Sequence, residues 1–307
     1  MKVLGIDTSN YTTSVAVVDD GGFRHAREIL DVKEGERGLR QSDALFLHVK
    51  NLPHLIERLS AGDVDAVAYS SRPRAVEGSY MPCFLAGEAV ARSVAATLGV
   101  PCCAFSHQAG HIEAAARTCG AELGDKFLAF HLSGGTTEIL FARADENEGW
   151  LCDILGKTLD ISAGQLIDRT GVLLGLKFPC GNELEKLAAA CADRIKDARP
   201  TVKDGSCNLS GAENKIQKFI LSGMPREYVA RYAIEYVGRT VCDMTAAARE
   251  KYPSLPVLYA GGVMRNEIIR KMLVSAFDNI CFAAVELSSD NAVGTAYLGY
   301  KKMGGGK

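Results

Sequence analysis

The chain has 307 residues, a formal net charge of −2, 47% hydrophobic residues and 23% charged residues. This composition excludes an intrinsically disordered chain, and the small net charge excludes a global positive field that would attract nucleic acid or anionic lipid. At about 150 residues per domain, the length predicts two domains.

The first third of the chain predicts a three-stranded meander followed by alternating helices and strands. Asp-Gly turn chemistry at residues 19–22 joins two segments rich in β-branched residues, which is typical of an antiparallel hairpin. Pro53 is expected to interrupt the first helix, because proline has no amide proton for a helix interior. The strands are predicted at 3–7, 12–18, 23–30, 65–70 and 100–105, and the helices at 42–59, 82–98 and 107–117.

The same order of elements begins again near residue 127. Two copies of one plan predict two α/β lobes, residues 1–110 and 111–290, with a ligand cleft between them. The final helix with the residue after it, 291–303, could pack on the N-terminal lobe instead of the C-terminal one. The second copy comprises predicted strands at 127–132, 137–142, 150–155, 257–260 and 280–283, and predicted helices at 162–174, 183–192, 211–221, 225–250, 266–276 and 291–302.

Cysteine usage and the apolar runs indicate the compartment. None of the ten cysteines forms a C-x-x-C pair, a pattern typical of a reduced, cytosolic protein. The N-terminus reaches Asp7 before a signal-peptide core is complete, and no apolar run approaches the roughly 20 residues that span a bilayer. We therefore expect a cytoplasmic protein without membrane contact.

Two turn segments occupy equivalent places in the two copies, residues 5–14 (GIDTSNYTTS) and 131–138 (HLSGGTTE). Their small and hydroxyl residues leave backbone N–H groups and hydroxyls able to face an anion. One such hairpin is more often only a turn, but a pair can hold the phosphates of a nucleotide, with Asp7 and Ser9 as candidates in the first. A further segment, 259–266 (YAGGVMRN), runs from a strand into Gly261 and Gly262, whose lack of Cβ lets a base or ribose approach the backbone.

These three elements resemble the superfamily of actin, sugar kinases and acetate kinase. This resemblance implies an α/β protein with a two-lobed actin-like, sugar-kinase-like ATPase fold built from duplicated mixed-sheet domains. Within the superfamily, the order of motifs is similar to that of the TsaD family. The motifs are SHQAGHIE at 106–113, LSGGT at 132–136, GKTLDISAGQLIDRTGVLLG at 156–175, FPCG at 178–181, GGV at 261–263 and SDNA at 289–292.

The resemblance implies transfer of a threonylcarbamoyl group from threonylcarbamoyl-adenylate to N6 of the tRNA adenosine next to the anticodon. It implies an adenine nucleotide (ATP, AMP or the acyl-adenylate) as ligand. It implies tRNA and companion threonylcarbamoylation proteins, including a same-fold heterodimer partner, as partners. The catalytic residues are unknown from the sequence, and no serine or cysteine nucleophile is required, because the acyl donor is already activated. The nucleotide contacts implied are His131, Leu132, Ser133, Gly134, Gly135, Asp168 at the ribose, Gly181, Gly261, Gly262 and Asn266.

His107 and His111 lie four residues apart on a predicted helix, so their rings project from one face. Two imidazoles with one carboxylate suit Fe²⁺ or Zn²⁺ and leave coordination positions open. The family likeness supplies Asp290 as the third ligand. The alternative is that His107 caps its helix while His111 packs beside it. The stretch HQAGH lacks the glutamate of an H-E-x-x-H zinc protease.

Several positions depart from the family pattern. Thr136 stands where members usually carry histidine, and Arg72-Pro73-Arg74 replaces the usual Gly-Pro-Gly. The two arginines could meet a phosphate or an RNA backbone, or form a solvated rim. These departures leave two alternatives open: a nucleotide- and metal-binding paralogue acting as a small-molecule carbamoyl or phosphoryl transferase, and a non-catalytic partner subunit.

Arginines and acidic residues alternate along the helix predicted at 225–250, which is typical of a solvated helix face. If tRNA binds, we expect partner proteins to supply much of the positive surface.

Overall fold

The computed structural model describes residues 1–9, 11–31, 39–287 and 292–305. The chain divides into two units, each assembled from segments that are distant in the sequence. Unit 1 contains residues 1–118, 142–152 and 286–307, and unit 2 contains residues 119–141 and 153–285. The lobe boundary predicted at residues 110 and 111 differs from this division, since it falls inside one continuous helix, α3 (His107–Thr118).

The sheet of unit 1 has the strand order β3-β2-β1-β4-β5. β1, β2 and β3 pair antiparallel, which confirms the predicted meander, and β4 runs parallel to β1 and β5. The register places Ile6 opposite Tyr69, so the next residues, Asp7 and Ser70, lie on neighbouring strands. The strands are β1 (Val3–Asp7), β2 (Thr12–Asp19), β3 (Gly22–Ile29), β4 (Ala66–Arg72) and β5 (Cys102–Ser106).

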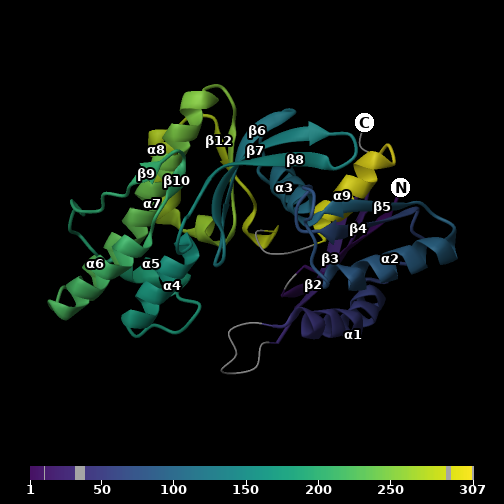
Figure 1. Ribbon diagram of the computed structural model, residues 1–307, viewed down its shortest axis with the longest axis horizontal. Helices are drawn as coiled ribbons and strands as arrows, with labels where there is room; N and C mark the ends of the chain where they lie inside the picture. Colours follow the sequence, from purple (N-terminus) through teal and green to yellow (C-terminus); the bar gives the residue numbers. More distant parts are fainter. Residues whose placement is uncertain (10, 32–38, 288–291, 306–307) are drawn as a thin grey trace. The chain divides into compact units, whose positions relative to one another are not determined.

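Four helices of the described chain belong to unit 1: α1 (Gln41–Leu59), α2 (Phe84–Leu98), α3 and α9 (Val293–Lys302). The final helix, α9, packs against α3 and against strands β1 and β4 (Figure 1). The last helix of the sequence therefore lies in the same unit as the first strand.

Glycines permit the close crossing of α3 and α9. A Cβ at Gly294 would lie 1.8 Å from the carbonyl oxygen of Gly110, and a Cβ at Gly110 would lie 2.6 Å from Oγ1 of Thr295. A Cβ at Gly5 of β1 would likewise lie 2.7 Å from Cβ of Ala296. Because residues with a side chain cannot approach so closely, these glycines determine where α9 begins relative to α3 and β1.

The prediction that Pro53 interrupts the first helix is wrong. α1 runs without a break from Gln41 to Leu59 and contains Pro53 in its interior. The helix is retained because one face packs in the core of unit 1, where Leu52, Leu55 and Leu59 are buried. This apolar contact offsets the missing amide proton, whose loss costs about 3 kcal/mol in an exposed helix.

The second sheet, which lies in unit 2 except for the parts of β7 and β8 within residues 142–152, repeats the topology of the first, with the strand order β8-β7-β6-β11-β12. β11 is parallel to both of its neighbours, as β4 is in unit 1. The duplication predicted from the order of elements is therefore confirmed. The strands are β6 (Lys126–Leu132), β7 (Thr137–Asp145), β8 (Gly149–Lys157), β11 (Val257–Ala260) and β12 (Ile280–Phe282).

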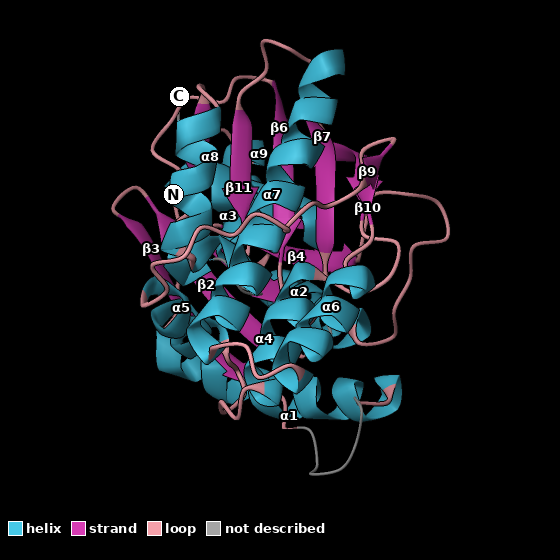
Figure 2. Cartoon of the chain, turned by 90° about the vertical axis from the view of Figure 1, so that its left-hand side faces the viewer, coloured by secondary structure: helices cyan, strands magenta, loops and turns pink. Residues whose placement is uncertain are grey.

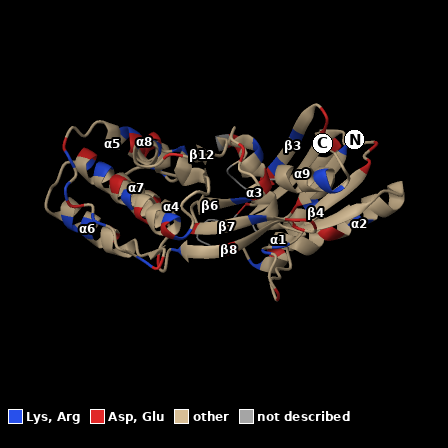
Figure 3. Cartoon of the chain, turned by 90° about the horizontal axis from the view of Figure 1, so that it is seen from above, with Lys and Arg blue, Asp and Glu red and all other residues tan. Residues whose placement is uncertain are grey.

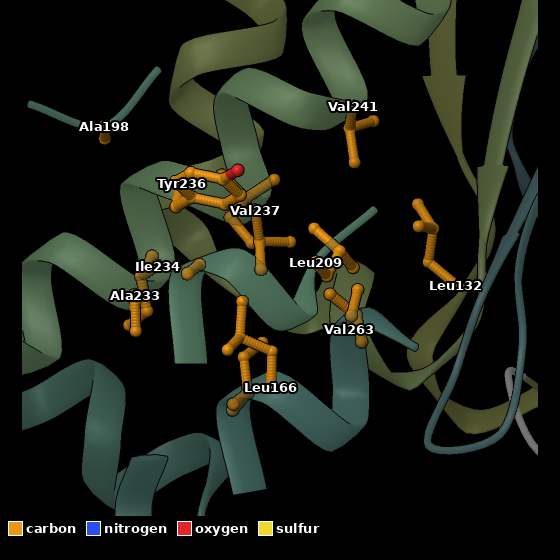
Figure 4. Close-up of a cluster of buried hydrophobic side chains, with 14 of the residues drawn as sticks. Leu132, Leu166, Ala198, Leu209, Ala233, Ile234, Tyr236, Val237, Val241 and Val263 are labelled. Atoms are coloured by element: carbon orange, nitrogen blue, oxygen red, sulfur yellow. The ribbon is translucent and has the colours of Figure 1, made fainter. Parts of the chain in front are cut away.

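Helices cover the sheet of unit 2 (Figure 2), with the long α7 packed on α5, α6 and α8. Aliphatic side chains of these helices and of the strands form its core, where Leu132, Leu166 and Val237 are fully buried (Figure 4). The helices are α4 (Ala163–Leu173), α5 (Gly181–Ala189), α6 (Ser210–Leu221), α7 (Arg226–Lys251) and α8 (Glu267–Ala276).

Short elements complete the described chain. β9 (Val202–Lys203) and β10 (Ser206–Cys207) form a two-stranded hairpin that the sequence patterns do not predict, because two residues are too few for a periodicity. Two 3₁₀ helices, η1 (Gly262–Arg265) and η2 (Val285–Leu287), follow β11 and β12. Among the described residues, no helix combines the length and the apolar character needed to cross a bilayer.

Candidate nucleotide and metal sites

Asp7 is the last residue of β1, and this residue is 1% exposed. Oδ1 accepts a hydrogen bond from the backbone N–H of Ser9 at 2.9 Å. Oδ2 accepts from Oγ of Ser70 at 2.5 Å and lies 2.7 Å from Nδ1 of His107. Burial opposes ionisation, but the charge of His107 and the hydrogen bonds from His107, Ser70 and Ser9 outweigh it and lower the pKa of Asp7 to about 2.

His107 and His111 lie on the first turns of α3, as the spacing predicts. Their ring centroids are 4.3 Å apart and their planes stand at 87°. Both side chains are half-buried. The backbone N–H of Gln108 donates to the carbonyl oxygen of Pro73 at 3.0 Å, so the start of α3 is tied to the segment after β4.

These two side chains could hold a divalent cation, because imidazoles are donors that suit Fe²⁺ and Zn²⁺. The third predicted ligand, Asp290, lies outside the described residues. Within the described part of the chain, no cluster of three or more His, Cys, Asp or Glu side chains suits a metal ion. The described backbone resumes at Ala292, whose N–H donates to Oγ of Ser14 at 2.9 Å.

The turn after β1 contains a buried hydroxyl that no other described residue pairs with. Ser9 is 3% exposed, and its Oγ has no hydrogen bond to a described residue. Thr8, by contrast, is fully engaged: its Oγ1 donates to the carbonyl of Cys83 at 3.0 Å and accepts from the N–H of Gly87 at 3.2 Å. Because buried polar atoms are normally paired, the Ser9 hydroxyl is the atom of this turn that a ligand would satisfy, whereas both oxygens of Asp7 are already occupied.

The turn after β6 is held by the N-terminus of α4. Oγ of Ser162 donates to the carbonyl of Gly134 at 2.7 Å and caps α4 by accepting from the N–H of Gln165. Gly164 packs so closely that an added Cβ would lie 2.5 Å from the carbonyl oxygen of Ser133. Gly134 and Gly135 themselves are exposed. Ser162 and Gly164 at the start of α4 therefore hold the turn in place, and its two exposed glycines are accessible to an anion.

Asp168 and Gly181, which are distant in sequence, lie close together in unit 2. Oδ1 of Asp168 accepts the backbone N–H of Cys180 at 2.8 Å, and Gly181 begins α5. A Cβ added at Gly181 would meet no protein atom within 4 Å. The carboxylate therefore positions the start of α5 and leaves open space at Gly181.

The Gly-Gly segment after β11 packs on the end of β6. Gly261 has a φ of +101°, and a Cβ there would lie 2.2 Å from the carbonyl oxygen of Leu132. Gly262 is exposed, and a Cβ added there would meet no protein atom within 4 Å. The first glycine is therefore required by the backbone conformation, while the second is free to face a ligand.

Three other predicted contact residues have defined positions in unit 2. Asn266 caps α8, since its Oδ1 accepts the N–H of Ile269 at 3.0 Å. The side chain of Leu132 points into the core, so only its backbone can meet a ligand. His131 is half-buried at the end of β6, beside Ala260 of β11.

The structure accounts for one departure from the family pattern. Arg72 forms an ion pair with Glu148, and Oε2 of Glu148 accepts the N–H of Ser106 at 3.1 Å. Arg72 thus connects β4 to the connection between β7 and β8 inside unit 1. Motif analysis missed Ser70, Thr295 and Glu148. Of these, only Ser70 had a signal in the sequence, because it ends a predicted strand that would run parallel to the strand ending at Asp7.

Solved structures define the class of fold. HypF in its full-length, phosphate- and nucleotide-bound form matches with a TM-score of 0.63 at 14% identity, over 99% of this chain and 47% of HypF, so the chain spans about half of that protein. A ROK family glucokinase from Streptomyces griseus in complex with glucose and AMPPNP matches with a TM-score of 0.53 at 14% identity, over 97% of this chain and 99% of the glucokinase. The fold is the actin-like, sugar-kinase-like ATPase fold that the sequence predicts.

The family follows from sequence. The sequence model of the family TsaD, tRNA N6-adenosine threonylcarbamoyltransferase, matches residues 32–297. The chain belongs to the TsaD family, which places it among transferases. A relative named tRNA N6-adenosine threonylcarbamoyltransferase, from Thermosipho africanus (strain TCF52B), is 29% identical over 320 residues that cover 98% of this chain and 94% of the relative.

Proposed function

We infer that this protein transfers a threonylcarbamoyl group from threonylcarbamoyl-adenylate to N6 of the tRNA adenosine next to the anticodon. The observation that carries this proposal is the match to the TsaD family over residues 32–297. The TsaD motifs at the turn after β6 and at Gly261 lie in unit 2 in an arrangement that suits a nucleotide.

Unit 2 would bind the adenylate. Gly134 and Gly135 are exposed in a turn whose Gly134 carbonyl is held by Ser162, the N-cap of α4, and such a turn would suit the phosphate of the leaving group. Open space at Gly181 and Gly262 allows the ribose and base to approach the backbone. Asp168, already fixed by Cys180, has a second oxygen with which to accept a ribose hydroxyl.

Unit 1 would hold the divalent cation, Fe²⁺ or Zn²⁺, on His107, His111 and Asp290. A cation there supplies positive charge that stabilises charge developing on acyl or phosphate oxygens. The Ser9 hydroxyl of the same unit, buried without a partner in the described part of the chain, is available to donate to an anionic ligand. No nucleophilic side chain is required, since orientation of the acceptor amine against an activated donor supplies much of the rate.

The protein would act with companion proteins. All four arginines of α7 that the sequence singles out contact protein acceptors, and basic and acidic residues alternate along the helix (Figure 3). These arginines are Arg226, Arg231, Arg239 and Arg249. Since they are engaged within unit 2, the positive surface for tRNA would come largely from partners, among them the proteins that make the adenylate and a same-fold heterodimer partner.

The test is transfer to unmodified tRNA by the purified protein with its companion proteins, ATP, threonine and bicarbonate, followed by mass spectrometry of the nucleosides. We expect threonylcarbamoyladenosine with the wild-type protein and at least a 100-fold lower rate with His111→Ala. His54→Ala is the matched control, because that imidazole is exposed on α1. No modified adenosine from a folded, nucleotide-binding wild-type protein would contradict the proposal.

Thr136 favours one alternative, a paralogue that transfers a carbamoyl or phosphoryl group to a small molecule. Its backbone N–H donates to Oγ of Ser133 at 3.1 Å, which fixes Thr136 in the turn after β6. Its side chain therefore places a hydroxyl in this turn, where the family usually has an imidazole. Turnover of ATP or carbamoyl donors on small acceptors without tRNA would support this alternative.

A further inference from the structure

Asp7 lies at the centre of a buried polar chain in unit 1 that joins four elements. Its Oδ2 lies 2.7 Å from Nδ1 of His107 on α3 and accepts Oγ of Ser70 on β4. Oγ of Ser70 lies 3.1 Å from Oγ1 of Thr295 on α9. Asp7, Ser70 and Thr295 are each at most 1% exposed. No solvent is therefore needed to complete this chain of contacts.

The direction of each hydrogen bond follows from the groups involved. The Ser70 hydroxyl has one proton, and it donates this proton to Asp7. Ser70 must then accept from the Thr295 hydroxyl. A carboxylate that receives the backbone N–H of Ser9 and the Ser70 hydroxyl acts as an acceptor only. His107 must therefore donate through Nδ1.

We propose that Asp7 is a positioning residue, which holds His107 as the Nδ1–H tautomer and presents its Nε2 lone pair to the cation. Ser70 and Thr295 hold the carboxylate in place. A carboxylate behind a ligating imidazole fixes the ring orientation and raises the basicity of the other nitrogen. Asp7 thus does not contact the nucleotide phosphate, in contrast to the expectation from the hairpin motif.

The close packing of α9 on α3 completes this chain of contacts. Gly110 lies about one turn after His107, and Thr295 follows Gly294, so the glycine contact between these helices brings the Thr295 hydroxyl to Ser70. The backbone just before α9 is fixed as well, since the N–H of Ala292, two residues after Asp290, donates to Ser14. The positioning chain therefore includes the helix that directly follows the predicted third ligand.

The tautomer can be read directly in the full-length protein without metal. Long-range ¹H–¹⁵N spectra at pH 8 distinguish the protonated ring nitrogen of each of the six histidines, and the spectrum of His107→Ala assigns the His107 signals. We expect His107 as the Nδ1–H tautomer in the wild-type protein. In Asp7→Asn, whose amide can donate to Nδ1, we expect the Nε2–H tautomer to gain population.

Metal affinity supplies the second measurement, with Co²⁺ as the probe in competition with a chromogenic chelator. We expect Asp7→Asn to weaken Co²⁺ binding about 10- to 100-fold, in line with other carboxylates behind ligating histidines. Asp7→Glu retains the carboxylate and is expected to recover part of the affinity. Thr245→Ala is the matched control, because it removes a buried hydrogen bond to Tyr259 in unit 2 and leaves the Asp7–His107 contact, so its His107 tautomer and Co²⁺ affinity should stay those of the wild type.

Two results would overturn the proposal: an Nε2–H tautomer in the wild-type protein, or wild-type tautomer and Co²⁺ affinity in a folded Asp7→Asn variant. The wild-type spectrum decides the first point even if the variant does not fold. The expected change in Co²⁺ affinity rests on the proposed function, whereas the expected tautomer of His107 does not. An Nδ1–H tautomer together with absent tRNA modification would therefore refute the proposed function and leave the positioning role intact.

Discussion

At the scale of single residues, pairs of polar groups determine the chemistry of each unit. Asp7 and Ser9 show this in one turn: the carboxylate is saturated by protein donors, while the neighbouring hydroxyl has no partner among the described residues. A motif that contains both residues predicts the same role for each. Hydrogen bonding separates them, because the ionised carboxylate of Asp7 only accepts hydrogen bonds, whereas the Ser9 hydroxyl has a proton that it can donate to an anionic ligand.

A second pair, Cys119 and Cys281 in unit 2, leads to a prediction about thiol reactivity. A hydrogen bond from Cys281 lowers the pKa of Cys119 to about 6, against the opposing effect of burial. The same contact, with burial, raises the pKa of Cys281. A thiolate forms above its pKa, so alkylation of Cys119 by iodoacetamide should rise through pH 6 and level off by about pH 7.

Peptide mapping by mass spectrometry measures this rate, and Cys102 is the internal control. Cys102 is exposed, but burial of its sulfur and the neighbouring Cys103 raise its pKa. We expect Cys119 to react at least tenfold faster than Cys102 at pH 7, and Cys281→Ala to move the Cys119 midpoint upward by more than one pH unit. Faster alkylation of Cys102 at pH 7 would contradict the prediction.

At the scale of elements, the crossing of α3 and α9 is the feature on which unit 1 depends. The contact between Gly294 and Gly110 leaves no room for a methyl group. We expect Gly294→Ala to lower the free energy of unfolding by about 2 kcal/mol or more, because backbone atoms must separate. Urea unfolding followed by circular dichroism measures the change.

Gly211→Ala is the control for this substitution. Gly211 lies in the first turn of α6, and a Cβ there meets no atom within 4 Å. Alanine is the better helix former by about 1 kcal/mol, so Gly211→Ala should stabilise the protein slightly. Equal effects of the two substitutions would show that the helix crossing tolerates a side chain.

At the scale of the whole molecule, charge limits what the protein binds by itself. The net charge is −2, and the arginines of α7 contact carbonyl or carboxylate oxygens of unit 2. We expect the protein without companions to bind tRNA weakly, with few phosphate contacts and therefore a shallow dependence of log K on log salt concentration. Filter binding between about 50 and 200 mM salt tests this expectation.

The companion proteins provide the contrast in the same assay. Their addition should raise tRNA affinity and steepen the salt dependence, because each new phosphate contact releases counterions. Tight, strongly salt-dependent binding of tRNA by this chain alone would show a basic surface that the engaged arginines of α7 do not supply.

The amino-acid sequence by itself determined most of the helices and strands and their duplicated order, because hydrophobic periodicity and turn residues act over a few neighbours. It also determined the family, through motifs that keep their order along the chain, and the pairing of His107 with His111, since helical spacing is a local property. The continuity of α1 through Pro53 depended on the burial of one face of this helix in the core, which the helix propensities of neighbouring residues do not predict. Only the tertiary structure decided that α9 returns to β1, that Ser70 and Thr295 support Asp7, and that Arg72 pairs with Glu148. The hydrogen bonds among these contacts join residues from 63 to 225 positions apart. Their partners are selected by packing and by the need to pair buried polar groups, which no local pattern records.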